Sequence, residues 1–273
     1  MNIIQRNFFR LLRSGAFDDK EPVEPMSPFK WRRLFQMVMA QRVVPVFAEG
    51  VANHDGDAGL NLPADLINSI AEAQKSDDLG SEVITEEELH FSSKRLNRRM
   101  KRIINKELKD NDEMSVETVD LLELIIFNVY HILNKGLSMD GIIRLGRYLR
   151  TRGDKVDFVK LDQWLAQLSL QRMAQLQGSI LIEVFGFEQD EVPFVVTKEK
   201  DAYNLTILSI SNLAKDTAED WHFRQSRTGF VRNNSTVLRR NVGRSIRFYN
   251  YAPWETTSSF FRNLGRSLSE IEE

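Results

Sequence analysis

Cysteine is absent from the 273 residues of this chain. Its absence excludes disulfides, thiol nucleophiles, thiolate zinc sites and iron–sulfur clusters. Histidine is scarce as well, with four residues at 54, 90, 131 and 222. No two of them have the i, i+4 spacing that places two metal ligands on one helix face. We therefore expect no metal and no cofactor.

Other signatures of chemistry are also missing from the sequence. Neither G-x-G-x-x-G nor G-x-x-x-x-G-K-[ST] nor G-x-S-x-G occurs, so no phosphate-binding loop or nucleophile elbow is predicted. The segment His54–Gly59 resembles half of a calcium loop, but the twelfth position counted from Asp55 is Leu66 instead of Glu. We interpret the segment as a solvated loop and expect no catalytic residue, so the chain is predicted not to be an enzyme.

Long apolar runs are missing too, and the basic N-terminus lacks the order of regions that a signal peptide has. These observations favour a cytoplasmic protein without a membrane partner. The charge is nearly balanced, with 37 Lys and Arg against 39 Asp and Glu, so the chain as a whole has no electrostatic preference for polyanions.

Helical periodicity dominates what is present. Ser27-Pro28, Ser138 and Asp157 are placed as helix starts, and Lys135-Gly136 and Gly186 as helix ends. Thr85 to Glu88 fits a capping box, which predicts a helix from there to about Lys109. The sequence predicts an all-α, irregular multi-helix bundle, with one short β element near 194–210 as an alternative.

We divide the chain into four regions that form one domain or two closely packed ones. These are a helical region (1–73), a charged loop with a basic amphipathic helix (74–115), a central helical region (116–193) and an Arg-rich helical region (194–273).

Two segments of the sequence contain clusters of Lys and Arg that could bind a ligand. The first lies between Lys94 and Lys109, opposite an apolar stripe. The second is in the tail, where an apolar stripe of Leu238, Val242, Ile246 and Tyr249 should dock on the body. Basic side chains on the opposite face, together with a neighbouring arginine, form the candidate anion or nucleic-acid site: Arg239, Arg240, Arg244 and Arg247. For both segments we favour a solvated face whose cations are neutralised by acids over a binding site, and the acids at 86–88 and 110–113 favour it most for the first.

Several segments together resemble an uncharacterised bacterial nucleotidyltransferase-like family. They are Phe8–Gly15, Trp31–Phe35 leading through Ala40–Pro45 to Gly50, and Leu124–Pro193 with His131. Where the family has Arg and Asp, this sequence has Asp140 and Arg144, an exchange at i, i+4 that suits a structural ion pair.

The resemblance implies helices that flank a catalytic core with strand-borne carboxylates for Mg²⁺. About forty residues, from Ala71 to Ser115, occupy the place of that core, and they contain no such strand signature. We therefore expect a pseudoenzyme: a non-catalytic binding or scaffold protein with an unknown protein partner. A nucleic-acid or nucleotide binder using the Arg-rich tail is the first alternative, and a nucleotidyltransferase with a remodelled site is the second.

Overall fold

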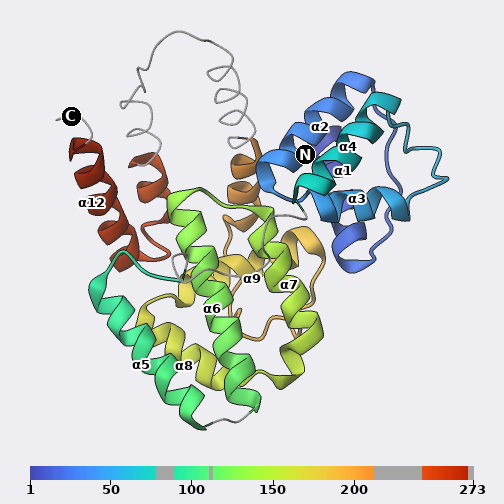
Figure 1. Ribbon diagram of the computed structural model, residues 1–273. Helices are drawn as coiled ribbons and strands as arrows, with labels where there is room; N and C mark the ends of the chain where they lie inside the picture. The colour runs from blue at the N-terminus through green and yellow to red at the C-terminus, as the bar shows by residue number, and fades with distance from the viewer. Residues whose placement is uncertain (78–88, 111–112, 212–241, 270–273) are drawn as a thin grey trace.

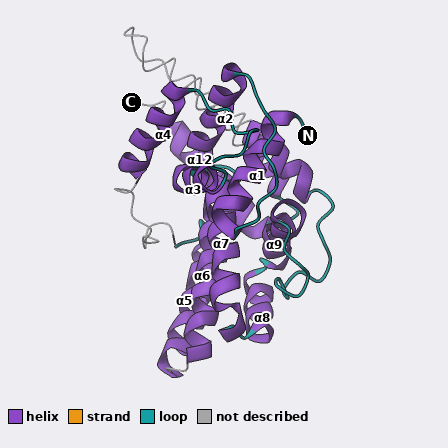
Figure 2. Cartoon of the chain, turned by 90° about the vertical axis from the view of Figure 1, so that its right-hand side faces the viewer, coloured by secondary structure: helices purple, strands orange, loops and turns teal. Residues whose placement is uncertain are grey.

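The computed structural model describes residues 1–77, 89–110, 113–211 and 242–269 (Figure 1). Within these ranges every regular element is helical and no strand occurs, as the colouring of Figure 2 shows. The predicted all-α bundle is confirmed. The alternative of a β element near 194–210 is wrong, because residues 194–201 are irregular and 202–211 form a helix. Among the described helices, none has both the length and the apolar character needed to cross a bilayer.

Four helices form the N-terminal part of the structure: α1 (Ile3–Phe17), α2 (Pro28–Gln41), α3 (Val44–Asn53) and α4 (Ala64–Asp77). Helices α1 and α3 cross at very short range because glycines face the partner backbone. A Cβ on Gly15 would lie 1.9 Å from the carbonyl oxygen of Val46, and one on Gly50 would lie 2.0 Å from that of Leu11. Only glycine fits at these two positions.

The remaining labelled elements are α5 (Lys94–Asp110), α6 (Glu113–Asn134), α7 (Met139–Arg152), the 3₁₀ turn η1 (Gly153–Lys155), α8 (Phe158–Leu168), α9 (Gln171–Phe185) and α12 (Pro253–Ser269). A further helical segment covers 242–248. The predicted boundaries at 73/74 and 115/116 fall inside α4 and α6. Helix α1 also contacts α7 and α9, and the buried apolar side chains of both parts belong to one cluster.

Helix α6 runs through the centre of this core. Most of its apolar side chains from Val119 onward are buried between α5, α7, α8 and α9, and the polar side chain of Asn128 lies among them. The Asn128 Nδ2 donates to the Gly141 carbonyl of α7 (3.0 Å) and to Oε1 of Gln177 on α9 (2.9 Å). Buried polar groups with partners on both sides fix the relative positions of three helices.

Most predicted helix ends are where the sequence places them. Asp157 caps α8 by accepting from the Lys160 amide, and Gly136 and Gly186 have the positive φ that ends a helix. Ser138 does not cap α7 with its side chain; its hydroxyl donates to the carbonyl of Gln41 instead. A tertiary partner replaces the local cap there.

The predicted start of the basic helix is wrong. Thr85 to Glu88 lie outside the described residues, but 89–93 are not helical and α5 begins at Lys94. Ser93 Oγ accepts from the Leu96 amide, and the Asn97 side chain both accepts from and donates to the backbone of Phe91. These contacts stop the helix from extending backwards into 89–93.

Candidate anion-binding surface on α5

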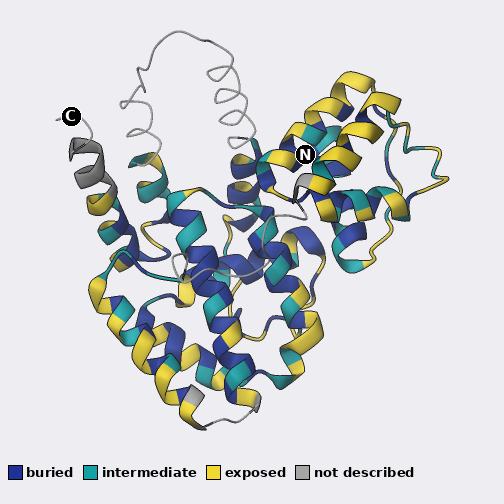
Figure 3. Ribbon diagram, viewed as in Figure 1, coloured by how far each residue is buried: buried dark blue, intermediate teal, exposed yellow. Residues whose placement is uncertain are grey.

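Helix α5 has a buried apolar side and an exposed basic side. Leu96, Met100 and Ile103 repeat at spacings of four and three and are buried against α6 and α8. The opposite side faces outward and is drawn as exposed in Figure 3. We define the α5 basic face as Lys94, Arg95, Arg98, Arg99, Lys101, Arg102, Lys106 and Lys109.

The acid within α5 whose side chain is described, Glu107, does not neutralise this face. Glu107 continues the apolar stripe four residues after Ile103 and is buried. Its carboxylate accepts from Lys160 Nζ (3.2 Å) and Ser115 Oγ (3.3 Å), so it points into the protein. Eight of the 37 basic residues and two of the 39 acidic residues of the chain lie in α5. The helix therefore carries six net positive charges while the rest of the chain carries eight negative ones.

Four arginines of the face line one open hollow of about 240 Å³: Arg95, Arg98, Arg99 and Arg102. Arg99 Nη1 donates to the carbonyl of Gln167 (2.9 Å) at the end of α8, where the helix dipole favours a cation. In the described ranges, no carboxylate oxygen lies within 4.0 Å of any cation of the face. Four guanidinium groups therefore gather around this hollow without carboxylate partners in the described ranges.

A second helix fixes the beginning of α5. Glu255 of α12 is only 2% exposed, and its carboxylate accepts from the amides of Ser92 (2.5 Å) and Ser93 (3.2 Å). Burial raises the pKa of Glu255 above its usual value of 4.5, although these amide hydrogen bonds act in the opposite direction. The contact joins residues more than 160 positions apart, and sequence periodicity could not have found it.

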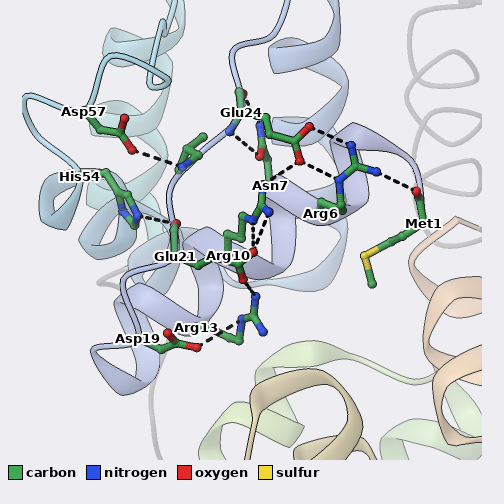
Figure 4. A network of polar contacts seen from close by, with 11 residues as sticks. Met1, Arg6, Asn7, Arg10, Arg13, Asp19, Glu21, Glu24, His54 and Asp57 are labelled. Atoms are coloured by element: carbon green, nitrogen blue, oxygen red, sulfur yellow. Dashed lines mark hydrogen bonds and ion pairs between the residues drawn. The ribbon is translucent and has the colours of Figure 1, made fainter.

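The arginines of α1 are in the opposite situation (Figure 4). The Arg6 guanidinium donates to both oxygens of Glu24 (2.7 and 2.8 Å). Arg10 donates to Glu21 (2.8 Å) and Glu24 (2.7 Å). Arg13 contacts Glu21 and, at 3.6 Å, the carboxylate of Asp19. These basic side chains are already neutralised and have a structural role.

The charge pairing around α1 changes the acidity of its carboxyls. The hydrogen bond from Arg6 is the largest influence on Glu24, and its pKa falls from 4.5 to about 2 despite opposing desolvation. The pKa of Glu21 is lowered as well, first by the hydrogen bond from Arg10. Both acids therefore stay ionised at neutral pH and hold the arginines in place.

The predicted tail site is only partly described. Arg239 and Arg240 lie outside the described residues. Arg244 Nη1 donates to the Asn134 carbonyl at the end of α6, and Arg247 is half-buried. The site of Arg239, Arg240, Arg244 and Arg247 therefore stays a prediction.

The predicted docking stripe of the tail is wrong where the structure describes it. Ile246 is 73% and Tyr249 is 52% exposed, whereas Phe248 and Tyr251 are buried. Leu238 lies outside the described residues. The helical segment ends at 248, and the following turn brings Tyr251 inward, so a continuous helical stripe through Tyr249 does not exist.

Two other sequence interpretations gain structural detail. The Asp140–Arg144 pair is confirmed, with Arg144 Nε 3.1 Å from Asp140 Oδ1.

In the segment that resembles a calcium loop, Asp57 accepts from the amides of Gly59 and Val23, and these hydrogen bonds lower its pKa. The ring nitrogens of His54 lie against two backbone carbonyl oxygens, those of Gly50 and Glu21. This loop is a structural element that holds the segment after α1.

No protein-family model matches this chain, and neither a curated protein nor a solved structure was found to match it. The resemblance to a nucleotidyltransferase-like family therefore stays a prediction. Within the described residues, no three His, Asp or Glu side chains gather in a way that could hold a metal ion.

Proposed function

We propose that this chain is a non-catalytic binding protein that holds a nucleic acid on the α5 basic face. The observation that supports this most is the row of exposed cations on α5 that, in the described ranges, lacks carboxylate partners. This moves the nucleic-acid alternative from the tail to α5. The proposal rests on the contacts of this surface and does not depend on the family resemblance.

The spacing of charge on α5 suits a nucleic acid. From Lys94 to Lys109 the helix rises about 22 Å, at 1.5 Å per residue, and eight cations lie along it. DNA carries about one negative charge per 3.4 Å of axis on each strand, and per 1.7 Å in a duplex, so either form places several phosphates along this length. Arginine, half of this set, presents a planar fork of donors that matches phosphate oxygens.

A membrane surface fits these observations less well. Basic amphipathic helices bind membranes by inserting their apolar side into the lipid. In α5 that side is already occupied, because Leu96, Met100 and Ile103 are buried in the protein core. What remains outside is charge alone, on a helix whose beginning is fixed by Glu255.

A triple variant tests the proposal against a control of equal charge. Arg95→Gln, Arg98→Gln and Arg102→Gln remove three cations from the α5 basic face. Lys20→Gln, Lys30→Gln and Arg33→Gln remove three exposed cations from α2 and the loop before it. Helix α2 lies on the opposite side of the molecule from α5 (Figure 1). Fluorescence anisotropy with a labelled oligonucleotide measures binding, and circular dichroism checks that both variants are folded.

We expect the α5 variant to bind at least tenfold more weakly at low salt, and the control to bind as the wild type does. The slope of log K against log salt should fall by about 2 for a single strand, at about 0.7 per phosphate contact. Equal weakening in both variants would contradict the proposal, as would no binding at micromolar protein. Tighter binding of polyglutamate than of any oligonucleotide would instead indicate an acidic protein partner. A further variant, Arg244→Gln with Arg247→Gln, tests the predicted tail site in the same assay.

A further inference from the structure

Helix α12 begins beside α5, and its outer side carries aromatic rings. The Glu255 carboxylate joins the first turn of α12 to the residues just before Lys94 (Figure 1). Trp254, the neighbour of Glu255, is 66% exposed, and Phe261 is 63% exposed. The two are seven residues apart, so they lie on one helix face about 10 Å apart along the axis.

This aromatic pair differs from isolated apolar side chains exposed elsewhere on the surface. Phe29, Val159 and Val196 lie on separate elements, and single exposed residues of this kind are normal on protein surfaces. Trp254 and Phe261 share one face with polar residues between them, Thr257 and Ser258. They also have a cation beside them, because Arg262 is exposed and donates to Nε2 of His90 (3.1 Å), three residues before Ser93.

We infer that the nucleic acid is single-stranded and that it extends from the α5 basic face onto α12, where Trp254 and Phe261 stack on its bases. The inference rests on the proposed function, and it specifies the substrate class of the same site. Rows of cations that follow a phosphate backbone, with exposed rings beside them, are the features that bind single strands without sequence preference. In a duplex the base faces are stacked inside the helix, so exposed rings could not reach them.

The experiment compares single-stranded and duplex oligonucleotides of the same sequence by anisotropy. Trp254→Ala and Phe261→Ala each remove one ring, and Trp254→Phe keeps a ring at the same place. Phe29→Ala is the matched control, because it removes a similarly exposed ring from α2 on the other side of the molecule.

We expect Trp254→Ala to weaken single-strand binding by at least about fivefold, as loss of one base stack does. Trp254→Phe should retain most of the affinity, and duplex binding should change little in any ring variant. If both alanine variants bind single strands as tightly as Phe29→Ala does, while the α5 triple variant still loses affinity, stacking is refuted and the proposed function stands. If wild-type protein prefers the duplex, the inference is also overturned. If no oligonucleotide binds, the proposed function fails and this inference fails with it.

Discussion

Helices α1 and α5 both carry arginines at spacings of three and four residues, yet their surroundings are opposite. On α1, Arg6, Arg10 and Arg13 are all paired with carboxylates from the loop that follows the helix. On α5, the described structure brings no carboxylate to the exposed cations, and the acid Glu107 is turned inward. Similar residue patterns therefore give a structural network in one place and an available charged surface in the other.

The difference shows that a basic stripe can be interpreted only together with the chain that folds against it. The loop after α1 supplies Asp19, Glu21 and Glu24 within eleven residues of Arg13 and is held in place by His54 and Asp57. The segment that packs against α5 at Arg99 is the end of α8, which presents the backbone carbonyl of Gln167. Proximity of acids in the sequence is a signal of neutralisation only when the fold brings them to the same face.

The largest effect we expect concerns the contact that positions α1. Gly15→Ala would place a Cβ 1.9 Å from the Val46 carbonyl oxygen, and α1 would have to move away from α3. The free energy of unfolding should fall by about 3 kcal/mol, at the upper end of what overpacking costs. Chemical denaturation measures it. Gly153→Ala is the control, because nothing lies within 4 Å of its Cβ position, and it should leave stability nearly unchanged. Similar losses in both variants would contradict the close crossing.

Single arginine replacements distinguish the two helices directly. Arg10→Gln removes hydrogen bonds to two carboxylates, and we expect a loss of about 1 kcal/mol in unfolding free energy. Arg98→Gln removes only a cation from a face of like charges, so stability should stay the same or rise slightly. Thermal unfolding of the two variants measures the difference. A greater loss for Arg98→Gln would mean that the α5 basic face has structural partners.

Most of the fold could be predicted from the sequence, because the residues that start and end its helices act locally. The capping Asp157 and the glycines that end α6 and α9 are all where the sequence places them. Gly178 packs closely against the chain that follows α9, because its Cβ position lies only 2.3 Å from a methyl carbon of Val195. The predicted helix starts failed where a residue distant in the sequence takes the place of a local contact. Ser138 bonds to Gln41, and Ser92 and Ser93 bond to Glu255.

The candidate site was only partly predictable. Both basic segments were identified, but nearby acids made α5 the weaker candidate, and the tail was preferred. One local signal concerned a different acid: Glu107 continues the spacing of Leu96, Met100 and Ile103, so it belongs to the buried side and does not neutralise the α5 basic face. The start of α5 and its junction with α12 depend on Glu255, and no local pattern contains that information.

Acidification should weaken the α1 network. Because the pKa of Glu24 is lowered to about 2 in the folded protein, its stabilising contribution is present above pH 4.5 and is lost as pH falls through about 2. The melting temperature should therefore decrease over this range, and the decrease should be shallower for Glu24→Gln. Melting curves between pH 5 and 2 test it. Parallel curves for the two proteins would show that this pairing does not contribute.

The smallest effect comes from giving α5 a carboxylate of the kind that α1 has. Gln167→Glu would place an acid at the residue whose carbonyl accepts from Arg99. We expect oligonucleotide affinity to fall about two- to fivefold, because an exposed ion pair is worth up to about 1 kcal/mol. Gln36→Glu, an exposed change of the same kind on α2, is the control. Unchanged affinity for Gln167→Glu would separate Arg99 from the binding surface.

Lysine footprinting tests most directly whether the α5 basic face, and no other basic surface, binds the nucleic acid. The wild-type protein is acetylated with and without a single-stranded oligonucleotide, and the modified lysines are quantified by mass spectrometry. Lys94, Lys101, Lys106 and Lys109 should be protected in the complex, whereas the exposed Lys20 and Lys30 should react as in the free protein. Protection of Lys20 and Lys30 with full reactivity along α5, at an oligonucleotide concentration that saturates binding, would contradict the assignment of the binding surface to α5.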